Sequence, residues 1–275
     1  LYTGFMVVVG VYLWMMMERK MNAFTRPAGF AAFIWRLILT TGTGSIFGFL
    51  VAREAYDAAI LAPMFIVMSF SFGLAIFILV LMGLYKWSKR PLGDAILVRL
   101  KNLLGIFVAG VLYFVLAYHL TNLYITQHHG VEQFILMDGG VYTQLFWIVQ
   151  IGLGSLLPLV LLYLPATAKS RGWIGISSLL VIIVGLSQMY VIIIGGQAFP
   201  MELFPGKEVS SSFFDGVVAP YIPSLPEFIL GIGGIGIALA ATVVGVRVLR
   251  FLPVSLADDQ VDPHYSAGDA AEASA

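Results

Sequence analysis

Seven long apolar stretches, separated by short polar loops, dominate this chain of 275 residues. A helix rises about 1.5 Å per residue and needs about 20 apolar residues to cross the hydrocarbon layer, and six of the stretches meet that length. Segments this long must satisfy their own backbone hydrogen bonds in lipid. The sequence therefore predicts an all-α, polytopic transmembrane helix bundle with seven spans: Leu1–Met17, Gly29–Ala52, Leu61–Tyr85, Asn102–Tyr124, Tyr142–Ala166, Trp173–Gln197 and Phe228–Leu252.

The composition narrows the chemistry that this chain can carry by itself. Hydrophobic residues make up 60% of the chain and the net charge is zero, which argues against nucleic-acid binding. There is no cysteine, and therefore no thiolate ligand for an iron–sulfur cluster. Only His119 of the four histidines lies within an apolar stretch, whereas a b-type haem needs facing pairs. We expect no haem and no iron–sulfur cluster here, so a diffusible carrier would bring any electrons.

The basic residues predict the orientation of the spans. Twelve of the 15 Lys and Arg residues fall on one side: Arg19, Lys20, Arg26, Lys86, Lys89, Arg90, Arg99, Lys101, Lys169, Arg171, Arg247 and Arg250. The positive-inside rule places that side in the cytoplasm and the protein in the cytoplasmic (inner) membrane.

The two ends of the chain lead to separate expectations. Residues 1–252 form the predicted bundle, and residues 253–275, rich in Asp, Ala and Ser, are predicted to be a disordered cytoplasmic tail. The chain opens at Leu1 within an apolar run, without the basic flank or cleavage site of a signal peptide. We expect further helices upstream.

Two groups of polar residues near the outer side are candidate site residues. Arg53, Glu54, Tyr56 and Asp57 lie between the second and third stretches. Charges at membrane depth are costly, about 2.5–3.5 kcal/mol on insertion scales, and often mark a proton or ligand path. A carboxylate here can accept a proton, with Arg53 tuning its pKa; the alternative, equally favoured, is an ion pair that closes the loop.

The second group lies on the fourth stretch. His119 and Asn122 are three residues apart and share a helix face, with Tyr118 beside Asn122. Histidine titrates near neutrality and can both bind an oxygen and exchange a proton. The alternative is an interfacial His and Tyr that bond between helices.

Several other polar residues have structural interpretations. Ser224 to Glu227 fits a capping box at the start of the seventh stretch, which does not prevent Glu227 from facing a site. His128, His129 and Glu132 resemble metal ligands, but neighbouring histidines diverge on a helix and no third ligand has suitable spacing. A partner-contact loop is favoured there, and no metal is expected. Gln150 and Gln188 are explained by hydrogen bonds between helices.

Several motifs, taken in order, resemble the NrfD/PsrC family, the polysulfide reductase membrane subunits. They are TTGTGS at Thr40–Ser45, REAYDAAILAP at Arg53–Pro63, GGQ at Gly195–Gln197 and PSLPE at Pro223–Glu227. YHLTN at Tyr118–Asn122 and FILMDGG at Phe134–Gly140 are most similar to the DsrP branch, the membrane subunits of Dsr sulfur-metabolism complexes. Family members commonly have eight to ten helices.

This resemblance implies a membrane subunit of a respiratory oxidoreductase complex, in anaerobic respiration and sulfur metabolism. It would exchange electrons between a quinone (menaquinone or a related one), bound as substrate, and an external iron–sulfur ferredoxin-like partner, beside other membrane-complex subunits. Asp57, Glu54 and His119 are then the catalytic candidates, and Tyr56, Arg53, Tyr118, Asn122 and Glu227 the binding candidates. Coupling to proton movement is a weaker hypothesis. The alternatives are a secondary transporter or channel, which predicts inverted repeats, and a membrane anchor without a site.

Overall fold

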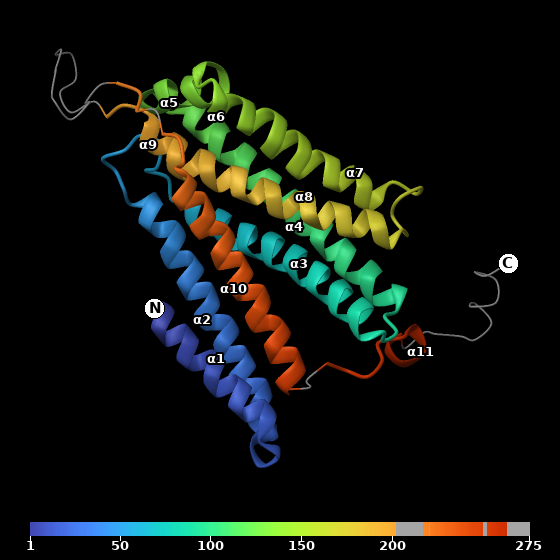
Figure 1. Cartoon of the computed structure of the whole chain (residues 1–275). Coiled ribbons are helices and arrows are strands. Elements are labelled where there is room, and N and C mark those ends of the chain that lie inside the picture. Colours follow the sequence, from blue (N-terminus) through green and yellow to red (C-terminus); the bar gives the residue numbers. More distant parts are fainter. Residues whose placement is uncertain (202–216, 220, 250–251, 263–275) are drawn as a thin grey trace.

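The computed structural model describes residues 1–201, 217–219, 221–249 and 252–262, and its architecture there is all-α, as predicted (Figure 1). Within these residues, six helical spans are long and apolar enough to cross a membrane: Arg19–Gly48, Leu61–Ser88, Asp94–Tyr124, Val141–Tyr163, Arg171–Ala198 and Leu225–Leu249. The first predicted span is helix α1 (Tyr2–Met17), whose 16 residues fall short of that length. The expected bundle is confirmed, with six full spans and one shorter apolar helix in the part of the chain that the structure describes.

Helix α3 (Leu61–Ser88) is central in the bundle. It packs against α2 (Thr25–Gly48), α4 (Asp94–Tyr124) and α8 (Arg171–Tyr190). Helix α4 begins at Asp94 rather than at the expected Asn102, because its polar first turns extend past the apolar part of the sequence. Helix α1 packs on α2 at the edge.

The fifth and sixth spans are interrupted by π-helical turns. The fifth runs through α6 (Val141–Gln144), a π-helical segment (Leu145–Leu156) and α7 (Leu157–Tyr163). The sixth continues from α8 through a π-helical turn (Val191–Gly195) into α9 (Gly196–Ala198). Such turns re-aim side chains and often occur at functional sites. Here Gln150 lies within the first π-helical segment, and Gln188 lies in the last turn of α8 before the second.

Close helix contacts depend on glycine where α2 meets α3. A Cβ on Gly44 would lie 2.7 Å from the Cα of Ala62, and one on Gly48 would lie 2.9 Å from the carbonyl oxygen of Ala58. Only glycine permits this approach of two backbones. On the same helix, the hydroxyls of Thr40 and Thr43 donate to the carbonyl oxygens of Arg36 and Leu39 one turn earlier.

The two ends of the bundle differ in character (Figure 1). At one end, α5 (His129–Gln133), α6 and α9 gather over the end of α4; we call this the α5 end. At the other, the α3–α4 connection, the turn before α8 and α11 (Asp258–Val261) lie together. This basic end carries Lys86, Arg90 and Arg171.

Part of the tail that we expected to be disordered has defined contacts. Arg90 donates to the carbonyl oxygens of Leu252 and Pro253, at 2.8 and 3.1 Å. The carboxylate of Asp258 accepts hydrogen bonds from the backbone N–H groups of Asp94 and Ala95, at the start of α4. Residues 252–262 therefore form a strap across the basic end, and residues 263–275 lie outside the described part.

Helix α10 (Leu225–Leu249), the last span, differs from the others because its side chains remain exposed. One described contact joins it to the end of α3, where the Arg247 guanidinium lies over the Trp87 ring, 4.7 Å from its centroid. The core therefore lies between α2, α3, α4 and the fifth and sixth spans.

Candidate functional site

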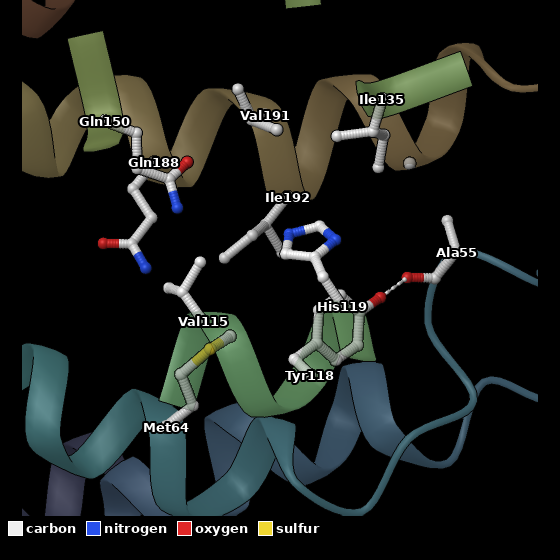
Figure 2. Close-up of a pocket in the computed structure, with 11 residues that line it drawn as sticks. Ala55, Met64, Val115, Tyr118, His119, Ile135, Gln150, Gln188, Val191 and Ile192 are labelled. Atoms are coloured by element: carbon white, nitrogen blue, oxygen red, sulfur yellow. Dashed lines mark hydrogen bonds between the residues drawn. The ribbon is translucent and has the colours of Figure 1, made fainter. Parts of the chain in front are cut away.

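A small cavity lies inside the bundle near the α5 end, between α3, α4 and the fifth and sixth spans (Figure 2). Its free volume is about 20 Å³, which is room for about one water molecule. Met64, Val115, Ile135, Val191 and Ile192 give it apolar walls. Its polar lining consists of the side chains of Tyr118, His119, Gln150 and Gln188. An apolar space with a few convergent polar groups is the usual form of a small-molecule site.

The His119 ring points into this cavity and is held from behind by a buried acid (Figure 2). Its Nδ1 lies 2.7 Å from Oε2 of Glu132, whose side chain is 0% exposed. An ionised carboxylate can only accept hydrogen bonds, so Nδ1 of His119 is the donor in this pair and carries the ring proton. Nε2 is then the acceptor that His119 presents to the cavity.

Asn122 continues the network away from the cavity. Its amide nitrogen donates to Oε1 of Glu132 at 2.9 Å, and its amide oxygen accepts from Nδ1 of His128 at 3.2 Å. Asn122 is 1% exposed and His128 is 4% exposed. The shared helix face predicted for His119 and Asn122 is confirmed, because both side chains reach Glu132 from α4.

A second, larger hollow lies beyond this network at the α5 end. This outer groove has a volume of about 680 Å³ and is lined by Arg53, Glu54, Asp57, His128 and other residues of the surrounding loops. Ala55 and Gly196 line both the groove and the cavity. The His128–Asn122–Glu132–His119 chain therefore connects a large polar groove with a small, mainly apolar cavity.

The residues Arg53, Glu54, Tyr56 and Asp57 do not all reach the same space. Arg53 donates to the carbonyl oxygen of Gln197 at 3.0 Å and lines the outer groove with Glu54 and Asp57. Tyr56 is instead buried in the core, and its hydroxyl donates to the carbonyl oxygen of Ile193 at 2.7 Å. Burial raises the pKa of Tyr56, while the Gln197 hydrogen bond and the Arg53 charge oppose that rise.

Tyr118 has both a structural contact and a place at the cavity. Its hydroxyl donates to the carbonyl oxygen of Ala55 at 2.6 Å, as Figure 2 shows. This bond ties the loop after α2 to α4. The ring lies 5.1 Å from the His119 ring, and Phe146 approaches His119 from the other span at 4.6 Å between centroids. Tyr118 therefore forms part of the cavity wall and packs edge-on against the His119 ring.

The two buried glutamines lack partners for some of their polar atoms. Within the described part of the chain, Oε1 of Gln150 and Nε2 of Gln188 have no hydrogen bond. Both residues also line a second small cavity next to the first, with Ser71 and Ser155. Our expectation of hydrogen bonds between helices is therefore not met at these atoms. Buried amide groups of this kind bind water or a polar ligand.

Glu227 lies apart from the cavity. Its Oε2 accepts hydrogen bonds from the backbone N–H and the hydroxyl of Ser224, at 2.7 and 2.9 Å, and from the hydroxyl of Tyr221. This is the side-chain-to-backbone half of the predicted capping box at the start of α10. In the described structure Glu227 lines neither the cavity nor the groove.

Glu132 is the site residue that sequence reasoning missed. We interpreted His128, His129 and Glu132 as a partner-contact loop, but His128 and Glu132 are buried. His129 instead bonds the carbonyl oxygen of Leu123. The apolar residues around Glu132 could have indicated its burial, since Val131 and Ile135 anchor α5 and the turn after it in the core. An acid within such a segment is buried with its neighbours.

The comparisons with known proteins agree with this architecture. The profile of the family described as polysulphide reductase, NrfD, matches residues 1–201. The chain therefore belongs to the NrfD family.

Two curated relatives are similar over much of the chain. The Hdr-like menaquinol oxidoreductase integral membrane subunit of Archaeoglobus fulgidus is 29% identical over 269 residues, which are 95% of this chain and 66% of the relative. One of the subunits of selenate reductase from Mesobacillus selenatarsenatis is 28% identical over 210 residues, 76% of this chain and 47% of the relative. This chain thus spans less than two thirds of either relative. No solved structure gives a significant match.

Proposed function

We propose that this chain is the quinone-interacting membrane subunit of a respiratory oxidoreductase complex, with its site at the His119 cavity. The observation that carries the proposal is the buried His119–Glu132 pair, which faces an otherwise apolar space within the bundle. Ionisable groups at membrane depth are retained for function by default. One relative is named a menaquinol oxidoreductase subunit, which supports menaquinone or a related quinone as the substrate.

The residues fit the chemistry of a quinol, and the cavity fits its ring only after opening. Nε2 of His119 is placed to accept the proton of a quinol hydroxyl, and Glu132 stabilises the imidazolium that results. The apolar walls suit the ring and the isoprenoid tail. A cavity of about 20 Å³ is smaller than a quinone ring. Binding therefore displaces flexible wall side chains, with Met64 the most adaptable.

Protons and electrons leave the quinol by different routes in this proposal. Oxidation of one quinol releases two protons and two electrons. The protons pass from His119 toward the outer groove, where Glu54 and Asp57 lie, while Asn122 holds Glu132 and His128 in place. The electrons pass one at a time to an external iron–sulfur partner at the α5 end. Reduction of a quinone reverses each step.

The orientation in the membrane follows from the same proposal. The basic end lies in the cytoplasm by the positive-inside rule, and the α5 end faces outward. The protein then belongs to the cytoplasmic membrane, with residues 252–262 on its inner side. A role in sulfur metabolism remains a prediction from the family resemblance.

The substitution His119→Gln tests the proposal in the assembled complex. We expect the rate of menaquinol-analogue oxidation to fall about 10²- to 10⁴-fold, because the proton acceptor is lost. The double variant His119→Gln/Glu132→Gln is made in parallel, since it leaves no unpaired buried carboxylate. His129→Gln is the matched control and should keep the wild-type rate.

Two outcomes would contradict this proposal. A His119→Gln complex that assembles and turns over at the wild-type rate excludes the site. If both variants fail to assemble with partner subunits while the quinone content of the remaining complex is unchanged, the chain is an anchor without a site.

A further inference from the structure

A third hollow lies at the basic end of the bundle, where membrane spans begin and end. It has a volume of about 470 Å³ and lies between the end of α3, the α3–α4 connection and the start of α8. Three of its eight lining residues are cationic: Lys86, Arg90 and Arg171. No acidic residue is among the eight. The hollow is therefore suited to an anion.

The guanidinium groups of the hollow are held in place before any ligand arrives. Arg90 donates to the carbonyl oxygens of Leu252 and Pro253 in the strap. Arg171 donates to the carboxylate of Asp94 at 2.7 Å and to the carbonyl oxygen of Leu92 at 2.6 Å. Within the described part of the chain, Lys86 makes no ion pair. Its ammonium group is the cation available to a ligand.

The start of α8 adds a second source of positive potential. This helix of 20 residues begins at Arg171, and its N-cap Ser170 makes no side-chain capping bond. The first backbone N–H groups of such a helix have no partner within the helix and favour an anion. Gly172 lines the hollow, and a Cβ there would meet only the Ser170 hydroxyl oxygen at 3.7 Å. An anion can thus approach the backbone closely.

The position of the hollow identifies the source of the anion. Trp87 and Trp173, which are 50% and 41% exposed, neighbour Lys86 and Gly172 in sequence at the ends of two membrane spans. Tryptophans at this level mark the boundary between headgroups and acyl chains. The remaining lining includes Met82, Gly83 and Leu92, which suit an acyl chain. Basic pockets between spans bind anionic headgroups in this way.

We propose that this hollow binds the phosphate diester of an anionic phospholipid. The phosphate lies between Lys86 and the start of α8, with Arg90 and Arg171 on either side. Because Arg90 also holds residues 252 and 253, the bound lipid stabilises the strap at the basic end. This site is independent of the quinone cavity, since the two share no lining residue.

The test compares lipid retention by the assembled complex in phosphatidylcholine nanodiscs doped with phosphatidylglycerol. Native mass spectrometry measures the phospholipid that remains bound. We expect selective retention of phosphatidylglycerol, about fivefold weaker in Lys86→Ala and about thirtyfold weaker in Lys86→Glu. Lys89→Glu, an exposed lysine of the same connection that does not line the hollow, is the matched control and should bind as wild type. Quinol oxidation should be unchanged in all three variants.

Each remaining outcome overturns the proposal. Equal retention of phosphatidylglycerol and phosphatidylcholine shows that charge is not recognised. Equal loss in Lys86→Glu and Lys89→Glu shows that only the general surface charge acts. Displacement of the lipid by inorganic phosphate at similar concentration shows a site for a soluble anion.

Discussion

At the scale of single residues, the buried carboxylate of Glu132 determines what His119 can do. Both oxygens of Glu132 accept hydrogen bonds, one from His119 and one from Asn122. A carboxylate without such partners would be costly in this environment. The hydrogen bonds from His119 and Asn122 therefore stabilise the buried carboxylate of Glu132. The carboxylate in turn determines which nitrogen of His119 faces the cavity. The His119–Glu132 hydrogen bond thus determines which tautomer of His119 is present at the site.

The substitution Glu132→Gln separates this role from a structural one. The Gln side chain keeps the volume and can donate to Nδ1 of His119, which moves the ring proton to Nε2. His119 then has no acceptor to offer a quinol, and we expect the turnover number to fall about 10²- to 10⁴-fold with little change in quinol KM. Steady-state oxidation of a menaquinol analogue by the assembled complex measures this.

The control for that substitution is Glu227→Gln, which alters a capping acid away from the cavity and should retain wild-type turnover. If the turnover number of Glu132→Gln equals that of the control, the His119–Glu132 pair contributes only to packing.

At the scale of elements, two devices shape the site. The π-helical turns in the fifth and sixth spans lie next to the cavity, close to Gln150 and Gln188. The contact of α2 with α3 holds the loop after α2, whose Ala55 carbonyl accepts the Tyr118 hydroxyl. The position of Ala55 at the cavity therefore depends on the packing of α2 against α3.

The substitution Gly44→Ala tests that packing. The added Cβ would lie 2.7 Å from the Cα of Ala62, and backbone atoms cannot move aside. We expect a loss of about 1–3 kcal/mol in the free energy of unfolding. Gly42→Ala is the matched control, because its Cβ would meet only the Leu1 side chain at 3.4 Å, and alanine favours the helix. Thermal unfolding in detergent compares them, and equal midpoints would show that α2 and α3 need no close approach.

At the scale of the whole molecule, the bundle separates two kinds of chemistry. The α5 end carries the His119 network and the outer groove. The basic end carries the strap of residues 252–262, the cationic hollow and an ion pair between Arg99 and Asp262 at 3.1 Å. Proton and electron exchange is proposed at one surface, and attachment to the lipid headgroups at the other.

Hydropathy predicted the spans well, because lipid allows few alternatives to helices. It also placed Tyr118, His119 and Asn122 on one α4 segment. It did not predict Glu132 as their partner, because this contact depends on how residues 125–128 turn α5 back over the end of α4. Tyr56, adjacent in sequence to Asp57, is in the core instead of the groove because its partner Ile193 lies 137 residues away along the chain. Composition did not predict the strap at 252–262, because a few specific hydrogen bonds, such as those of Asp258 with the start of α4, hold it in place.

The decisive experiment is a density map of the assembled complex with a menaquinone analogue bound. We expect the headgroup between α4 and the sixth span, with one ring oxygen about 3 Å from Nε2 of His119 and the wall side chain of Met64 displaced. A quinone found elsewhere, with the cavity closed and the His119–Glu132 pair unaltered, would contradict it.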